Sequence, residues 1–303
     1  MFCKTMSVTH YSKCPVCNSD KIHPQLSAED YTVSHEVFDI WHCDACTARF
    51  TQNVPVSSEI GRYYQSQEYI SHSETKEGLV NRLYHSVRKI TMRSKQNWVK
   101  SAANLKTGSL LDVGCGTGAF IHYMQQIGWT VTGLEPDERA RENAAKLYNL
   151  QPLPPSTLYE LPAQSFDVIT MWHVLEHVHD LHQYLDQLKR LVKPGGAILI
   201  AVPNYTSLDA KHYGKYWAAY DVPRHLYHFS PKSMQILLEQ HGIQIKRKHP
   251  MVFDSFYVSL LSQQYKTGKG GLIGGAWNGF ISYLKALKYV DQCSSVVYEC
   301  SID

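Results

Sequence analysis

The chain has 303 residues, of which 44% are hydrophobic and 19% are charged, so it can bury one large core and has room for a small second module. Its formal net charge of +3 is a smaller basic excess than a dedicated nucleic-acid binder carries. The longest apolar run, residues 197–203, is too short to cross a bilayer, and no apolar signal segment follows the first charge. We therefore expect a cytoplasmic protein that binds no nucleic acid and has no membrane span.

Four of the eight cysteines form two Cys-x2-Cys pairs, Cys14 with Cys17 and Cys43 with Cys46. Two such knuckles present four thiolates to one zinc ion, and because four thiolates leave no open coordination position, the zinc would be structural. Two redox pairs, or a ribbon without metal, are the alternatives. The loop between the knuckles has no basic run, which favours a scaffold. We assign residues 1–55 to a zinc-ribbon module.

Apolar residues recur at three- and four-residue steps between about 77 and 104, which predicts one or two amphipathic helices. Three tyrosines precede this segment: Tyr63, Tyr64 and Tyr69. They form either a polar aromatic lid over a ligand or the packing between two modules. We describe residues 56–104 as a helical connector and lid.

From residue 109 onward, predicted strands and helices alternate. Such alternation is typical of an α/β, doubly wound, mostly parallel sheet with helices on both faces. The predicted strands are 109–114, 130–136, 166–172 and 197–203, and the helices between them are 119–128, 137–149 and 181–196. A further edge strand at 243–252 and a closing strand at 294–302, inserted antiparallel, complete the sheet.

Ligands of such sheets bind beyond the carboxyl ends of the strands, where the first strand ends in Gly114-x-Gly116-x-Gly118. The glycines let a ligand approach the backbone, and Glu135 is placed to accept hydrogen bonds from two ribose hydroxyls. Dinucleotide enzymes share both features but space their glycines differently. Asp112 suits a ligand with an amino group or a sulfonium better than one with phosphates, because like charges repel.

A His-x-x-Glu-His sequence, formed by His173, Glu176 and His177, follows the third predicted strand. Some zinc peptidases use this spacing, with both histidines on one helical face and a third ligand downstream. Here His173 falls at the end of a strand. We therefore interpret Glu176 and His177 as residues that cap and pack the following helix.

Together these segments resemble class I S-adenosylmethionine-dependent methyltransferases. The sequence LLDVGCGTGAF resembles their first motif, GLEPD the acidic end of their second strand, FDVITMWHVLEHVHD their fourth-strand segment, and LKRLVKPGG the helix that leads into their fifth strand. The matches occur in the family's order over roughly residues 105–205. The resemblance implies a Rossmann-like, seven-stranded sheet, S-adenosylmethionine as the cofactor, and methyl transfer as the activity.

The resemblance also implies roles for individual residues. It places Asp112, Gly114 and Gly116 around the methionine moiety and Glu135 on the ribose. Trp172 and His173 are expected beside the sulfonium. Three neighbours in the same two motifs complete the expected cofactor-binding set: Cys115, Gly118 and Pro136.

The segment after the fifth strand, residues 204–230, is rich in Tyr, Trp and His. In the family such an insertion binds the acceptor, and DVPRHLYHFSP resembles a segment of methyltransferases that carry an N-terminal zinc ribbon, including sugar C-methyltransferases. We assign residues 105–303 to a methyltransferase domain with this insertion. His225 is our first candidate for the base, with His173 and His228 as further candidates, because imidazole titrates near neutral pH. A structural role for each is the alternative.

The sequence therefore predicts transfer of a methyl group from S-adenosylmethionine to a small-molecule acceptor, such as a sugar or another metabolite, by a monomer or homodimer. Two other functions remain open. One is a zinc-ribbon adaptor that binds the cofactor without turnover, and the other is a dinucleotide-dependent oxidoreductase.

Overall fold

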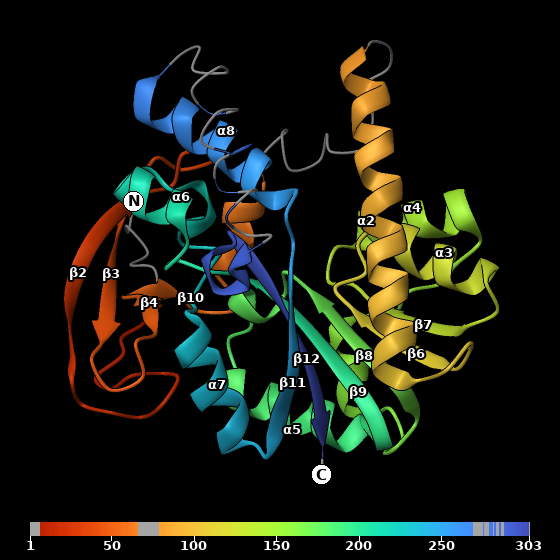
Figure 1. Ribbon diagram of the computed structural model, residues 1–303. Helices are drawn as coiled ribbons and strands as arrows, with labels where there is room; N and C mark the ends of the chain where they lie inside the picture. Colours follow the sequence, from red (N-terminus) through yellow and green to blue (C-terminus); the bar gives the residue numbers. More distant parts are fainter. Residues whose placement is uncertain are drawn as a thin grey trace, which may run out of the picture.

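A computed structural model describes residues 7–65, 79–268 and 288–302, together with positions 275, 279, 280, 282 and 285. A large sheet with helices on both faces forms one part of the molecule, and a smaller sheet, one strand of which ends at Cys43, lies beside it (Figure 1). No helix in these ranges combines the length and the hydrophobicity of a membrane span.

The large sheet has the strand order β11-β12-β9-β8-β6-β7. Its strands are β6 (Ser109–Val113), β7 (Thr130–Leu134), β8 (Phe166–Trp172), β9 (Val192–Pro203), β11 (Ile243–Pro250) and β12 (Ser295–Ile302). The strands β7, β6, β8 and β9 pair in parallel, and β12 pairs antiparallel with both β9 and β11. The closing strand is therefore inserted antiparallel, as predicted, and the α/β, mostly parallel fold is confirmed.

The sheet has six strands instead of the expected seven. Beyond β7, Leu134 and Leu153 form a single parallel bridge where a seventh strand would lie. Leu153 stands between Pro152 and Pro154, and prolines have no N–H to donate to a neighbouring strand. The prolines thus limit this pairing to one residue.

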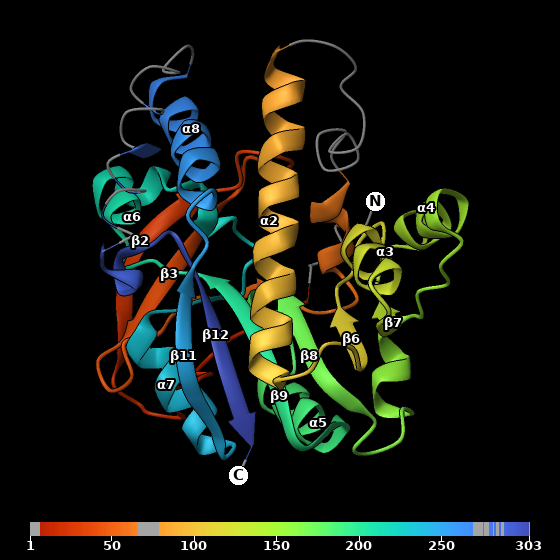
Figure 2. The same ribbon diagram turned by 45° about the vertical axis from the view of Figure 1, so that its right-hand side comes forward.

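Helices cover both faces of the sheet, as a doubly wound fold requires (Figure 2). Leu110 of β6 lies in one buried cluster with residues of α2 (Leu79–Ala103) and α3 (Ala119–Gln126). Its neighbour Leu111 faces the other way, into a cluster with leucines of α5 (Leu181–Leu191) and α7 (Pro231–Gln240). A further helix, α4 (Glu138–Tyr148), contacts α3.

The remaining helical elements are short, except for α8. They are α6 (Leu208–Tyr213), α8 (Asp254–Thr267), η1 (Ile60–Tyr64), η2 (Pro155–Tyr159), η3 (Leu175–His177), η4 (Gly214–Tyr216), η5 (Ala218–Tyr220) and η6 (Val290–Gln292). The helix predicted for 181–196 is shorter than expected, because β9 begins at Val192 and runs through Pro194.

The predicted connector forms one long helix, α2, within the described residues. Tyr63 is buried in a cluster with residues of the ribbon and the insertion, which is the packing role. The Tyr64 hydroxyl lies 3.0 Å from Nδ1 of His177. Tyr69 and the rest of 66–78 lie outside the described residues.

The ribbon and the insertion share one sheet. Its order is β10-β4-β3-β2, built from β2 (Ile22–Glu29), β3 (Val37–Cys43), β4 (Arg49–Thr51) and β10 (Tyr227–His228), while β1 (Val8–Thr9) pairs with β5 (Val54–Pro55). Since β10 belongs to the insertion, Tyr227 pairs with Phe50 and His228 pairs with Arg49 across the two predicted modules. The ribbon is thus continuous with the predicted acceptor-binding segment.

A buried ion pair also joins the ribbon to the insertion. The Arg224 guanidinium, 2% exposed, donates to Oδ1 of Asp30 in the ribbon at 3.0 Å and to Oδ1 of Asp221 at 2.6 Å. It also donates to the carbonyl of Tyr63 in the connector at 2.7 Å. One side chain of the insertion therefore holds groups from all three predicted segments.

Candidate functional site

The parallel strands bring the expected cofactor-binding residues to one edge of the sheet. Val113 at the end of β6 pairs with Leu134 of β7 and Met171 of β8. Asp112, Glu135 and Trp172, which stand at or beside these strand ends, therefore share one edge, in agreement with the sequence prediction. All three side chains are at least nine-tenths buried.

The glycine turn follows β6, and each of its three glycines has a positive φ, which favours glycine. A Cβ on Gly114 would lie 2.4 Å from Cγ2 of Val174, so a larger residue does not fit there. A Cβ on Gly116 would meet nothing within 4 Å, and the turn therefore has open space on that side. Gly118 precedes the first residue of α3.

Asp112 is a buried carboxylate beside this turn. Its Oδ1 accepts a hydrogen bond from the Thr170 hydroxyl at 2.6 Å, and Lys95 of α2 supplies a nearby positive charge. Burial raises the pKa of Asp112 to about 7 in spite of both partners. The carboxylate is therefore poised to gain from any additional cation that binds next to it.

Glu135 supports the turn from the end of β7. One carboxylate oxygen accepts from the amide of Gly116 at 2.8 Å, and the other accepts from the amide of Asp137 at 3.0 Å. Burial raises the pKa of Glu135. Each carboxylate oxygen has two lone pairs, so acceptor capacity remains for a pair of hydroxyls.

Trp172 presents its ring to a cation. Nζ of Lys95 lies 4.2 Å from the centroid of this ring, and Phe120 packs against it edge to face at 5.5 Å. The indole Nε1 is buried and has no hydrogen-bond partner. A positively charged group thus has an aromatic face on one side and Asp112 in electrostatic reach.

The other two neighbours predicted for the cofactor set point elsewhere. The Cys115 side chain is buried in a small cluster with Ile121, and its Sγ lies 2.7 Å from the position of a Cβ on Gly133. Of Cys115, therefore, only the backbone faces the turn. Pro136 is exposed, and its carbonyl accepts from the guanidinium of Arg141 at 2.9 Å.

His173 follows β8 with a φ of 59°, a strained conformation for a residue with a side chain. Its Nε2 lies 3.0 Å from Oδ2 of Asp254 and its Nδ1 lies 3.4 Å from Oε1 of Glu176. Burial disfavours the charged imidazole, but the two carboxylates outweigh it and raise the pKa of His173 to about 10. At neutral pH His173 is a donor between two carboxylates, which does not favour its expected role as a base.

Glu176, His177 and His225 form a second group of side chains next to His173. One potential ligand atom from each lies within 4.8 Å of the others. The two imidazole rings meet edge to face with centroids 4.6 Å apart, and burial lowers the pKa of His177 to about 4. Glu176 does not cap the next helix as expected: α5 starts after Asp180, and both Glu176 carboxylate oxygens are buried without a hydrogen bond.

His228 is not part of this group. It lies in β10, where its Nε2 is 3.2 Å from the hydroxyl of Thr51 and its ring packs edge to face on Tyr220. Burial holds the pKa of His228 well below its usual value. These contacts give His228 a structural place in the joint between ribbon and insertion.

The four predicted metal ligands of the ribbon converge. Sγ of Cys14 lies 3.6 Å from Sγ of Cys46, and Sγ of Cys17 lies 3.6 Å from Sγ of Cys43. A tetrahedral zinc ion with Zn–S bonds of about 2.3 Å sets its sulfurs about 3.8 Å apart. All four thiols are free of disulfides, so the donor set fits zinc.

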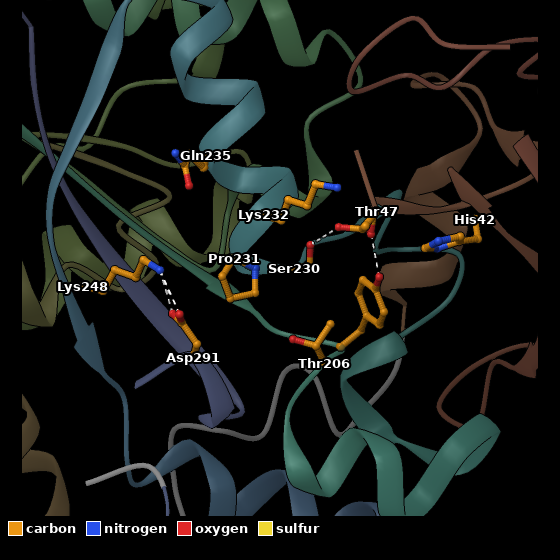
Figure 3. Close-up of a pocket in the computed structure, with 10 residues that line it drawn as sticks. His42, Thr47, Thr206, Ser230, Pro231, Lys232, Gln235, Lys248 and Asp291 are labelled. Atoms are coloured by element: carbon orange, nitrogen blue, oxygen red, sulfur yellow. Dashed lines mark hydrogen bonds and ion pairs between the residues drawn. The ribbon is translucent and has the colours of Figure 1, made fainter. Parts of the chain in front are cut away.

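A cavity of about 500 Å³ is lined by a different set of residues (Figure 3). Its lining comes from the ribbon, the insertion, α7 and the sheet edge, and includes His42, Tyr205, Lys232 and Lys248. No residue of the predicted cofactor, base or metal sets lines it. Lys248 is paired there with Asp291 at 2.8 Å.

A family model described as a methyltransferase domain matches residues 87–247, more than half of the chain. The chain belongs to the class I S-adenosylmethionine-dependent methyltransferases. The resemblance seen in the sequence motifs is thereby confirmed.

Individual relatives of this methyltransferase match it over a shorter stretch. The ubiquinone biosynthesis O-methyltransferase of Pseudomonas fluorescens (strain Pf0-1) is 35% identical over 116 residues, 36% of this chain and 50% of that protein. The protein of the same name from Pseudomonas paraeruginosa is 37% identical over 117 residues, again 36% of this chain and 50% of the relative. The chain thus spans about half the length of the curated relatives it matches.

Solved structures show the same fold. Magnesium protoporphyrin IX methyltransferase from Synechocystis PCC 6803 with bound SAH aligns with a TM-score of 0.50 and 15% identity, over 80% of this chain and 97% of that one. A putative sarcosine dimethylglycine methyltransferase from Galdieria sulphuraria aligns with the same TM-score and 13% identity, over 70% and 86%.

Sequence reasoning missed several residues at the site of this methyltransferase. Lys95 and Asp254 reach it from helices far away in the chain, and no local pattern marked either of them. The His-x-x-Glu-His spacing does mark Glu176 and His177, but from sequence alone we interpret these two residues as capping and packing the following helix. Their proximity to His225 depends on the insertion, whose path the sequence did not reveal.

We predict that the affinity for S-adenosylmethionine falls as the pH drops through about 7. Asp112 loses its charge in that range, because burial has raised its pKa to about 7, and the protonated form no longer attracts a positive ligand. Calorimetry at pH 6 and pH 8 measures the difference. Asp112→Asn should weaken binding at pH 8 and flatten the pH dependence; an unchanged slope in that variant would assign it to another group.

Proposed function

We propose that this protein transfers the methyl group of S-adenosylmethionine to a hydroxyl-bearing small molecule. The observation that supports this best is the group of Asp112, Glu135 and Trp172 at one edge of the sheet in a chain of the methyltransferase family. The same membership leaves a dinucleotide-dependent oxidoreductase without support.

The cofactor's sulfonium supplies an electrophilic methyl, so the protein has to align donor and acceptor and handle a proton. Glu135 would hold the ribose hydroxyls with its remaining lone pairs. Asp112 and the face of Trp172 would favour the cofactor's positive charges, in the region where Lys95 already places a cation.

We place the acceptor between the end of β8 and the insertion. The described residues offer there the imidazoles of His177 and His225 and the carboxylate of Glu176, which together can receive or stabilise a proton. The matched Pseudomonas relatives are named as O-methyltransferases, which supports an oxygen acceptor. A sugar or another metabolite with a free hydroxyl fits this site.

We further propose that the four ribbon cysteines hold one structural zinc ion. The thiol spacing fits tetrahedral zinc, and backbone amides support the thiolates: Val16 donates to Sγ of Cys14 and Ala48 donates to Sγ of Cys46, both at 3.4 Å. The ribbon residue Thr51 also donates its hydroxyl to the carbonyl of His225 at 2.7 Å. Loss of the zinc would therefore disturb the acceptor side of the site.

We predict about one tightly held zinc per chain at the cysteines and its loss in Cys14→Ser. Metal analysis by mass spectrometry checks the zinc, and differential scanning calorimetry checks the expected drop in stability. Cys115→Ser is the matched control, because that thiol lies outside the ribbon, and it should keep its zinc. Disulfides within the pairs, or no cysteine-dependent zinc in protein made without chelator, would overturn this proposal.

We predict that His225→Gln lowers turnover by about a hundredfold or more while cofactor affinity stays nearly constant, since proton-transfer groups contribute on that scale. Transfer of labelled methyl from S-adenosylmethionine into fractionated metabolites identifies the acceptor, and calorimetry reports cofactor binding. His241→Gln, which removes a histidine paired with the exposed His182 outside the proposed site, is the control and should keep full activity.

The other outcomes of this experiment are equally informative. Loss of cofactor binding in His225→Gln would mean a structural role, and near-normal turnover would remove His225 from the mechanism. Cofactor binding by the wild-type protein with no transfer to any fraction would favour the zinc-ribbon adaptor.

A further inference from the structure

Glu176, His177 and His225 converge on one point, although they come from two distant segments of the chain. Glu176 and His177 lie in η3, directly after β8, and His225 lies in the insertion. The backbone also ties the two segments, because the amide of Leu226 donates to the carbonyl of Glu176 at 2.8 Å. The convergence is therefore built into the fold.

Hydrogen bonds fix the orientation of both imidazoles. Nδ1 of His177 lies 2.9 Å from the carbonyl of Arg224, and Nδ1 of His225 lies 2.9 Å from the carbonyl of Ala219. A carbonyl only accepts, so each Nδ1 carries the proton and each Nε2 keeps a free lone pair. The Tyr64 hydroxyl, 3.0 Å from Nδ1 of His177, can accept from the same N–H. Histidines that bind metals are held in the same way, with one ring nitrogen donating to a carbonyl and the other free for the metal.

Glu176, the third residue of this group, offers lone pairs as well. The Glu176 side chain is fully buried, and neither of its carboxylate oxygens takes part in a hydrogen bond. One potential ligand atom from each of the three side chains lies within 4.8 Å of the others, and lone pairs so close together repel unless a cation or a proton lies among them. Glu176 has only the longer contact to His173, whose closer partner is Asp254.

The charges of the surrounding side chains also favour the binding of a cation. His173 is shared by Glu176 and Asp254. Arg224 is shared by Asp30 and Asp221, and Asp221 also lies 3.8 Å from Nε2 of His225. Lys95 is also in electrostatic reach of Asp254, but it is shared with Asp112. Five carboxylates thus share three positive side chains. The excess negative charge beside the imidazoles is what a divalent ion would neutralise.

We propose that Glu176, His177 and His225 bind a divalent transition-metal ion, separate from the zinc of the ribbon. Two imidazoles and one carboxylate are a ligand set that suits zinc, cobalt(II) or iron(II), whereas magnesium and calcium take mainly oxygen ligands. Three protein ligands leave at least one coordination position open. In so far as the proposed function holds, that position faces the acceptor and would take its hydroxyl oxygen, and the ion would make that hydroxyl more acidic, so that its proton can leave to water. His225 would then act as a metal ligand in place of a base, and His225→Gln would lower turnover by removing that ligand.

Metal binding by the purified full-length protein tests this proposal. After dialysis against zinc and removal of the excess, the wild-type chain should hold about two zinc ions, one in the ribbon and one here. Glu176→Gln and His225→Gln should each hold about one, with affinity for the second ion at least about tenfold weaker by calorimetry, because each loses a ligand. His241→Gln removes an imidazole from the pair with His182 and should keep both ions.

Cobalt(II) gives a second readout that needs no substitution. Added to protein whose ribbon already holds zinc, it should produce weak d–d absorption bands without thiolate charge-transfer bands. Their absence, together with one zinc per wild-type chain, would refute the proposed site. A second ion that persists in Glu176→Gln and His225→Gln but is lost in His241→Gln would refute it too, since the pair of His182 and His241 would then bind the ion.

The metal measurements need neither cofactor nor acceptor, so the two proposals fail separately. Methyl transfer by protein that binds no second ion would leave the proposed function in place and remove the metal site. A second ion bound at Glu176 and His225, without transfer to any metabolite fraction, would do the reverse.

Discussion

The placement of the proposed acceptor side depends on one buried cation, the guanidinium of Arg224. Arg224 lies in the insertion, but its guanidinium is held by Asp30 of the ribbon, by Asp221 and by a carbonyl of the connector. Removing one partner of a buried ion pair costs about 3–5 kcal/mol, because the other charge is left without compensation. The ribbon and the insertion are therefore expected to fold together.

Under the proposed function, the ribbon is accordingly a part of the acceptor site and not an appended module. Its strand β4 pairs with β10, and the hydroxyl of Thr51 holds the backbone of His225. The cofactor side is built differently: Asp112, the glycine turn and Glu135 all come from consecutive strand ends of the large sheet. The chain thus joins the proposed site for the methyl donor, made from local motifs, to the proposed site for the acceptor, made from long-range contacts.

This difference between local motifs and long-range contacts explains which features could be predicted from the sequence. The glycine turn, Asp112 and Glu135 follow from short motifs within one β-α-β unit, and the four cysteines follow from their spacing. The pairing of β10 with β4 joins residues more than 170 positions apart, so no local pattern could reveal it. The seventh strand was expected from the family, but the prolines around Leu153 limit that pairing to a single bridge.

The measurement that tests this account most directly compares Asp30→Asn with wild type, because Asp30 lies in the ribbon and pairs with Arg224. Cofactor affinity is measured by calorimetry, and labelled methyl transfer is measured on the same samples. We predict an affinity within about twofold of wild type and a transfer rate at least about tenfold lower, since small displacements of reacting groups cost that much. Asp20→Asn, an exposed ribbon carboxylate, should change neither. Full transfer by Asp30→Asn would contradict the role of the ribbon in the acceptor site.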